Sequence, residues 1–477
     1  MKKVGTVLPY ICAGILCILI SFPMFSQSIY IDEAYSIEFV REGVASIVAS
    51  TAADVHPPLY YLILKVAEVL FGENLAVYRL VSLLALYINL LAIGATYVRR
   101  RWNNATAIFY VLWFGAAHVT FERSVAIRMY SWAALFVMAT AIFLLEYYEK
   151  GKTRDYVLGI IMTLAAMYTH YYAVFAVFVT WVMVLVAVLW RKRERIGKVI
   201  LAGGVIAVGY LPWMSVVANQ TKSVKSDYWI QPLDWGAWFT SPAEMMESSM
   251  TGIGFVFFVL ILGMVIAAFV QKNWAALLSF AVFAGTMLMG ALISVLIVPI
   301  WDTRYLYVSW GLMALFVGLV AASSQKEASY IPQGVLVLLL LAETFFSVTT
   351  MQEHDMVTCG ADEWVAFLEE NVEENANVIY ADPTEHVRIY RVYMPGAEFT
   401  NAARLFGSEG QETLQSILSQ SESEQVWFMI NYTQSALGNR VRDAVNAQGY
   451  ELESEGVYSI QAKNIEIFRI GRAANEE

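Results

Sequence analysis

Long apolar runs recur from the amino terminus to about residue 350, and they constrain the fold more than any other feature of the sequence. The hydrocarbon core of a bilayer is about 30 Å thick, so a helix that crosses it needs roughly 20 apolar residues. Of the 477 residues, 58% are hydrophobic and only 15% are charged, which indicates an integral membrane protein. The sequence predicts about eleven spans, near residues 6–25, 75–98, 104–121, 128–147, 155–170, 172–190, 199–218, 251–270, 273–298, 305–322 and 331–349.

The charged residues divide the chain into two parts of different character. Residues 351–477 hold 22 Asp and Glu against 8 Lys and Arg, whereas residues 1–350 hold 19 acids and 23 bases. We therefore expect a transmembrane domain over 1–350 and a soluble, acidic domain over 351–477. The first apolar run follows Lys2 and Lys3 and lacks a clear small-residue cleavage site, so we interpret it as a retained span.

Basic residues predict the orientation of the spans. If the amino terminus is cytoplasmic, 15 of the 23 Lys and Arg residues in 1–350 fall in cytoplasmic segments, including the run Arg99-Arg100-Arg101. Shifting the register by one span would invert this asymmetry. We therefore expect a multi-pass protein of the cell membrane whose first long loop and carboxy-terminal domain are extracytoplasmic.

The carboxy-terminal part has the pattern of a small α/β domain. Helical periodicity covers residues 362–374, 411–421 and 435–448, and strand patterns cover 377–382, 426–430 and 465–470. Helices that alternate with strands favour a layered α/β arrangement. The part contains no Gly-rich phosphate loop, so we assign it no cofactor. The predicted fold class is thus a mainly α membrane body with a small α/β domain.

The first predicted outer loop, from Gln27 to about Gly72, carries the most informative residues. Two adjacent acids, Asp32 and Glu33, come directly after the first span. Apolar residues at helical spacing then predict two interfacial helices, over 37–48 and 59–70. Between these helices stand Asp54 and His56, followed by two prolines that end one helix and begin the next.

The acids of this loop have two interpretations. A carboxylate here can act as a general base toward a hydroxyl acceptor. Asp32 and Glu33 can equally cap a helix amino terminus, where acids are favoured, and spacing alone favours the cap. His56 is open to a structural interpretation in the same way, as a hydrogen-bonded histidine before the two prolines.

Other predicted outer loops bring ionisable residues to the same face. Arg128 and Arg304 are the best candidates for an anion site, because a guanidinium fork suits a phosphate held at the membrane surface. Ionisable residues at span ends are functional candidates by default, although each one alone more often anchors the interface. The remaining candidates near these loops are Glu122, Tyr130, His170 and Tyr305.

With these residues in place, the chain resembles the GT-C membrane glycosyltransferases, specifically the glycosyltransferase family 39-like group. That group is related to protein O-mannosyltransferases, lipid A aminoarabinose transferases and lipopolysaccharide galacturonosyltransferases. The resemblance is carried by Asp32-Glu33, by His56-Pro-Pro-Leu-Tyr-Tyr61, by Arg128-Met-Tyr130 and by Arg304-Tyr305, and it covers roughly residues 1–320.

The resemblance implies an inverting transfer from a polyprenyl-phosphate-linked sugar to a hydroxyl of an envelope glycan, lipid or protein. By this similarity Asp32 is the catalytic base and Glu33 supports it. The resemblance gives four residues to the donor phosphate and five to the cavity wall. The phosphate residues are Arg128, Arg304, His56 and Tyr61, and the cavity residues are Asp54, Glu122, Tyr130, His170 and Tyr305. No nucleic acid partner is implied.

The chain departs from its relatives at two positions that bear on a metal. Relatives with Glu-Lys-Pro-Pro have an acid that can join a metal site, and here Val55 and His56 stand in those positions. Asp54 and His56 are the possible ligands of a divalent metal, but no His/Glu pair has ligand spacing, so no cofactor is assigned. An acid also often precedes Arg-Met-Tyr in the family, where this chain has Ala126 and Ile127.

The main alternative is a transporter or flippase for a lipid-linked saccharide. Such a protein would have charges buried in mid-span and internal repeats, neither of which we find in the sequence. A second alternative, a membrane scaffold whose acidic tail binds a partner, leaves the motifs of the outer loops unexplained.

Overall fold

The computed structural model describes residues 2–25, 29–226, 230–247, 253–323, 330–354, 361–381, 387–406, 410–420, 425–431, 435–460 and 463–472. The chain divides into two compact units. The first contains Met1–Phe25 and Phe39–Met351, and the second contains Ser26–Glu38 and Gln352–Glu477. The second unit therefore takes in the segment with Asp32 and Glu33, which the sequence analysis grouped with the membrane domain.

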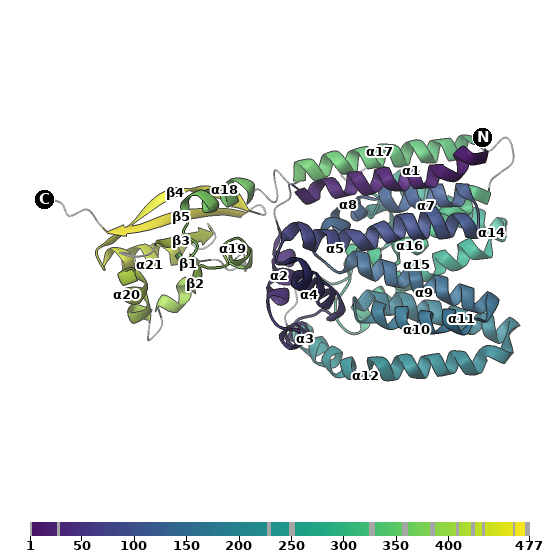
Figure 1. Ribbon diagram of the computed structural model, residues 1–477, viewed down its shortest axis with the longest axis horizontal. Coiled ribbons are helices and arrows are strands. Elements are labelled where there is room, and N and C mark those ends of the chain that lie inside the picture. The colour runs from purple at the N-terminus through teal and green to yellow at the C-terminus, as the bar shows by residue number, and fades with distance from the viewer. Residues whose placement is uncertain are drawn as a thin grey trace. The chain divides into compact units, whose positions relative to one another are not determined.

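The first unit is a bundle of apolar helices joined by short segments (Figure 1). Its shorter elements are α3 (Val44–Ala53), α4 (Leu59–Phe71), α6 (Arg99–Arg101), α8 (His118–Val125), α13 (Trp235–Glu244) and the 3₁₀ helix η4 (Thr303–Ser309). Its longer helices are α1 (Lys2–Ser21), α5 (Leu75–Tyr87, continued by a π-helix over Ile88–Val98), α7 (Asn104–Ala116), α9 (Tyr130–Lys150), α10 (Thr153–Met167), α11 (Tyr171–Arg191), α12 (Ile196–Ser226), α14 (Ile253–Val270), α15 (Trp274–Leu296), α16 (Trp310–Ser323) and α17 (Tyr330–His354).

The predicted polytopic helical body is confirmed, but fewer helices are full-length spans than the sequence suggested. Within the described residues, eight helices are long and apolar enough to cross a bilayer, and a bent pair makes a possible ninth. That pair is α7 and α8, which the sequence analysis treated as one span; extended backbone at Ala117 breaks it, and the two halves meet at 68°. The predicted first span lies in α1, whose apolar stretch Thr6–Ser21 is too short to be counted among the eight, and the predicted fifth span is α10, of 15 residues.

Helix α16 is the centre of the first unit, since 94% of its apolar segment is buried. It packs against α7 and α15. Close approach to α7 depends on Gly318, where an added Cβ would lie 2.6 Å from the backbone oxygen of Thr106. A small residue at a helix crossing is the usual way for membrane helices to approach closely.

The second unit contains a five-stranded sheet in the order β2-β1-β3-β5-β4. Strands β1 (Asn377–Ala381), β2 (Glu398–Asn401) and β3 (Val426–Asn431) are parallel, whereas β4 (Tyr450–Ile460) and β5 (Lys463–Arg472) run antiparallel. Its helices are α2 (Ile31–Arg41, of which Ile31–Glu38 belongs here), α18 (Ala361–Asn371), α19 (Val387–Tyr393), α20 (Gly410–Gln420) and α21 (Ser435–Asn446). The predicted small α/β domain is thus confirmed.

Candidate active site

The polar centre of the first unit is a chain of three side chains. Asp54 Oδ2 lies 2.7 Å from His56 Nδ1, and His56 Nε2 lies 3.0 Å from Arg128 Nη2. Because an arginine can only donate, Nε2 of His56 accepts, and its Nδ1 therefore carries the proton that it donates to Asp54. The two contacts thus assign a neutral His56, held between an acid and a cation. Arg128 is only 4% exposed.

Local chain geometry explains why these three residues meet. Helix α3 ends at Ala53, and Asp54 follows with its N–H donating to the Ser50 carbonyl. Two prolines then precede α4, and the N–H of Leu59 donates to the Tyr168 carbonyl, at 2.9 Å, in the turn between α10 and α11. Since proline fixes the backbone before α4, the segment with Asp54 and His56 is held against the ends of these helices.

Asp54 is ionised in this setting. Burial would raise the pKa of its carboxyl, but the hydrogen bond from His56 and the positive charge of Arg128 outweigh burial and lower the pKa below its ordinary value. A carboxylate beside a buried guanidinium offsets part of the cost of burying the cation. Arg128 also lies within 3.5 Å of the Tyr61 hydroxyl, a long contact that places Tyr61 beside the same guanidinium.

A cluster of rings from three further elements lies beside the side chains of Asp54, His56 and Arg128. Tyr130 from α9, His170 from the start of α11 and Tyr305 from η4 have ring centroids 5.1–6.5 Å apart. Arg304 lies over the Tyr305 ring at 5.3 Å, and its Nε is 3.1 Å from Asp302. Aromatic faces attract cations, so the ring cluster helps to hold a guanidinium here.

His170 is neutral in the folded protein. Its Nδ1 accepts a hydrogen bond from the Tyr172 N–H at 3.1 Å, which leaves the proton on Nε2. Burial, together with the nearby positive charges of Arg128 and Arg304, lowers the pKa of His170 well below its ordinary value. The site therefore contains a neutral histidine donor beside two guanidinium groups.

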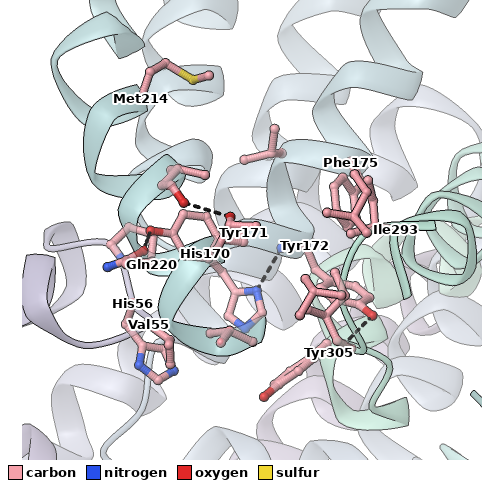
Figure 2. A pocket seen from close by; sticks show the side chains of 18 of the residues that line it. Val55, His56, His170, Tyr171, Tyr172, Phe175, Met214, Gln220, Ile293 and Tyr305 are labelled. Carbon is pink, nitrogen blue, oxygen red and sulfur yellow. Dashed lines mark hydrogen bonds between the residues drawn. The ribbon is translucent and has the colours of Figure 1, made fainter. Parts of the chain in front are cut away.

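A cavity of about 380 Å³ begins at this cluster. His56, His170 and Tyr305 line one end, and Met214 lies at the opposite end of the view (Figure 2). Most of its wall is apolar and comes from α11, α12 and α15. A second apolar cavity, of about 410 Å³, lies between α10, α11 and α12 and shares Val174 with the first. Apolar space thus continues along α11 and α12 from the polar cluster.

The structure brings eight of the eleven predicted site residues together in the first unit. Three of them form the chain described above, and the others surround it: Asp54, His56, Arg128, Tyr61, Tyr130, His170, Arg304 and Tyr305. Glu122 bonds instead to its neighbours on α8, His118 at 3.2 Å and Arg123 at 3.1 Å. Arg123 in turn lies over the Tyr130 ring, so Arg123 connects Glu122 to the cluster.

Asp32 and Glu33 belong to the second unit, in the first turn of α2. Glu33 is 2% exposed, and its Oε2 accepts a hydrogen bond from the Tyr30 N–H at 3.1 Å. This is the capping contact that the spacing favoured. Asp32 is half-buried, and its backbone oxygen accepts from the Ser36 hydroxyl.

The possible metal ligands do not fit a metal site well. Among the described residues, no group of three or more His, Cys, Asp and Glu side chains could hold an ion. Both ring nitrogens of His56 already contact Asp54 and Arg128. A zinc site needs at least three protein ligands, so we derive no step through a metal.

The polar residues Tyr171 and Gln220 of the cavity wall were not among the predicted site residues. The Tyr171 hydroxyl donates to Gln220, and the amide of Gln220 donates to the Thr51 carbonyl on α3 at 3.0 Å. Gln220 thus fixes α12 to the last turn of α3, directly before the loop that carries His56. The predicted seventh span ended at residue 218, although α12 continues to Ser226. A polar residue in the last turns of a long apolar helix was the signal available.

Comparisons with known proteins agree with this architecture. Residues 55–215 match the model of the family described as dolichyl-phosphate-mannose-protein mannosyltransferase. Two solved structures of ArnT from Cupriavidus metallidurans are similar, each 13% identical and covering 98% of this chain and 98% of that chain. The TM-score is 0.59 for the apo state and 0.62 for the state bound to undecaprenyl phosphate. No curated protein sequence matches the chain.

The apolar helices and the match over residues 55–215 together indicate a multi-pass membrane protein that is similar in part to membrane glycosyltransferases. More narrowly, the chain has the GT-C fold of ArnT, so the resemblance to GT-C enzymes inferred from the sequence is confirmed.

Proposed function

We propose that this protein transfers a sugar from a polyprenyl-phosphate-linked donor to a hydroxyl group, with inversion, on the outer face of the cytoplasmic membrane. The observation that carries the proposal is the buried Arg128–His56 pair at the end of an apolar cavity. A polyprenyl phosphate has the matching chemistry, an anionic head on a long apolar tail. That ArnT has been solved with undecaprenyl phosphate supports this class of donor.

The phosphate is held by cationic and neutral donors. Arg128 and Arg304 supply guanidinium forks, His170 and Tyr61 supply neutral donors beside them, and His56 orients Arg128 through its Nε2. Donors fixed in a buried site stabilise charge that develops on a leaving group without having to reorganise. As the bond between sugar and phosphate breaks, negative charge grows on the phosphate oxygen that these residues face.

The polyprenyl tail occupies the two apolar cavities along α11 and α12. They are lined mainly by aliphatic and aromatic side chains, and Val174 contributes to both. Burying apolar chain surface contributes about 25 cal/mol per Å², so the tail supplies much of the affinity. The polar residues at one end then fix where the sugar lies.

Asp32 is the base of the proposed reaction. It takes the proton of the acceptor hydroxyl as the acceptor oxygen bonds to the anomeric carbon. The bond from that carbon to the phosphate oxygen breaks, and its electron pair leaves with the polyprenyl phosphate. A single displacement of this kind inverts the anomeric centre. Glu33 keeps the first turn of α2 in place through its bond to the Tyr30 N–H.

The test compares envelope glycans and glycolipids, by mass spectrometry, in cells with and without the protein. Transfer predicts one sugar increment on an acceptor that is present only with the wild-type chain. A flippase would instead leave the acceptor unmodified and change only the side of the membrane on which the donor lies. An unchanged acceptor profile, with donor present, would exclude the transfer reaction.

The acceptor is an envelope glycan, lipid or protein, and the proposed location of the carboxy-terminal domain is extracytoplasmic. Tryptic cleavage of that domain in intact spheroplasts tests the location. Protection from trypsin, with cleavage after the membrane is opened, would place the domain on the cytoplasmic side and overturn the proposed orientation.

A further inference from the structure

Within the second unit, α19 contacts the helix that carries Asp32. The Arg388 guanidinium lies over the Tyr35 ring, 3.8 Å from its centre, and bonds to the Glu38 carboxylate. The Arg391 Nη1 lies 3.6 Å from the other Glu38 oxygen. Because α19 has only seven residues, all of these contacts come from two turns.

The contacts hold α2 on both sides of Asp32. Before it, the N–H of Ile29 donates to the Tyr393 hydroxyl at 3.1 Å. After it, Tyr35 and Glu38 follow at one and two helical turns, and both meet Arg388. The backbone on either side of the Asp32 carboxylate is thus tied to α19.

Helix α19 is itself fixed to the core of the α/β domain. Its Tyr390 and Tyr393 rings pack on Trp364 of α18, with centroids 5.2 and 5.8 Å apart, and the Trp364 side chain is fully buried. Arg388 therefore joins a rigid part of the domain to α2. A chain segment held by several such contacts samples fewer conformations than one held at its ends alone.

We propose that Arg388 is a positioning residue, and that the α/β domain acts in transfer by fixing the orientation of the helix bearing Asp32. The inference rests on the proposed function, in which Asp32 is the base. A base must lie within hydrogen-bond reach of the proton that it takes, so small rotations of α2 lower the rate. Arg388 touches neither substrate; it acts through Tyr35 and Glu38.

Amide hydrogen exchange on the full chain in lipid nanodiscs tests, without any substrate, whether Arg388 restrains α2. In Arg388→Ala, the amides of residues 29–36 should exchange about tenfold faster than in the wild type. Arg388→Lys, which keeps the charge but loses the planar stack on Tyr35, should lie between the two. The matched control is Arg440→Ala, because Arg440 lies over the Phe406 ring at 4.1 Å in the same domain without contacting α2. Equal exchange rates in Arg388→Ala and Arg440→Ala would show that Arg388 does not restrain α2.

A second measurement separates positioning from general damage. Product formed in cells, measured as the acceptor-linked sugar, should fall roughly tenfold in Arg388→Ala and recover in part in Arg388→Lys. Affinity of the purified variant for undecaprenyl phosphate should stay within about twofold of wild type, because binding is separable from turnover. Loss of both product and affinity would mean structural damage and overturn the positioning role.

The two proposals fail in distinguishable ways. If wild-type cells contain no acceptor-linked sugar, the transfer reaction is wrong, whatever the exchange result. If wild-type cells contain it and Arg388→Ala makes as much as Arg440→Ala, the transfer stands and the role of Arg388 is wrong. Should Arg388→Ala fail to fold, Glu38→Gln removes the ion pair from the other side and takes its place in both measurements.

Discussion

The two compact units hold opposite kinds of polar cluster. In the first, the buried cation Arg128 and two neutral histidines gather at the end of an apolar cavity. In the second, a short helix carries Asp32 and Glu33, and arginines of α19 bind the Glu38 side chain of that helix. Cations beside apolar space suit the binding of a lipid phosphate, whereas an acid on a held helix suits proton transfer. Under the proposed function, donor binding and acceptor activation are separate tasks that mutation can separate.

Asp32→Asn should have the largest effect on turnover and none on donor binding. A general base contributes about 10²- to 10⁴-fold to a rate, so the acceptor-linked sugar should fall by that factor. The affinity of the purified variant for undecaprenyl phosphate, measured by tryptophan fluorescence, should not change. Asp443→Asn, an exposed acid on α21, is the control and should behave as wild type.

Two outcomes would contradict the assignment of Asp32 as the base. Full activity in Asp32→Asn would remove the base from the second unit. Loss of the protein itself, seen as absent membrane-inserted chain, would favour the interpretation of Asp32 as a helix cap.

Arg128→Gln should have the opposite pattern, with weaker donor binding as the primary defect. A hydrogen bond to a charged group contributes roughly 1.5–3 kcal/mol, so the affinity for undecaprenyl phosphate should fall about tenfold to hundredfold. Arg154→Gln, which changes an arginine with a side chain 74% exposed, should leave binding unchanged. If Arg128→Gln lowered turnover at saturating donor but left affinity intact, the first unit would not be the binding unit.

Much of this organisation could be predicted from the sequence because the signals were strong and local. Apolar length fixed most of the helices, and the motif His56-Pro-Pro with Arg128-Met-Tyr130 indicated the residues that meet at the cavity. Prolines and the ends of spans bring such residues to one membrane face without knowledge of the packing. The grouping of Arg128 with His56 and Tyr61 follows from this.

What the sequence did not predict depends on tertiary contacts. Extended backbone at Ala117 breaks the third predicted span, although the residues around it are apolar. Strand β4 was missed because Glu451, Glu453 and Glu455 alternate on an exposed edge, where burial gives no signal. The role of Glu38 was also invisible, because its arginine partners lie about 350 residues further along the chain.

Gly318→Ala should destabilise the first unit and leave the second unchanged. The new Cβ would meet the Thr106 backbone oxygen at 2.6 Å, which cannot move aside as a flexible side chain can. Overpacking of this kind costs about 1–3 kcal/mol. Gly263→Ala in α14, where no atom lies within 4 Å, is the matched control and should be neutral or slightly stabilising. Thermal unfolding in detergent, followed by thiol labelling of buried Cys17, reports on the first unit; a shift as large in Gly263→Ala would rule out the close crossing as the cause.

The smallest predicted effect concerns the neutral state of His170. The folded protein holds its pKa well below 6.5, whereas the unfolded chain binds a proton near that value. Below about pH 6.5 the unfolded state therefore binds more protons, so the free energy of unfolding should fall by up to about 1.4 kcal/mol per pH unit. His170→Gln keeps an acceptor for the Tyr172 N–H but cannot titrate, so its unfolding midpoint should depend less on pH between 7 and 5. An unchanged pH dependence in His170→Gln would mean that His170 binds a proton as readily in the folded protein as in the unfolded chain. At low pH the first unit would then carry one more cation beside Arg128, which would sharpen its contrast with the acidic helix of the second.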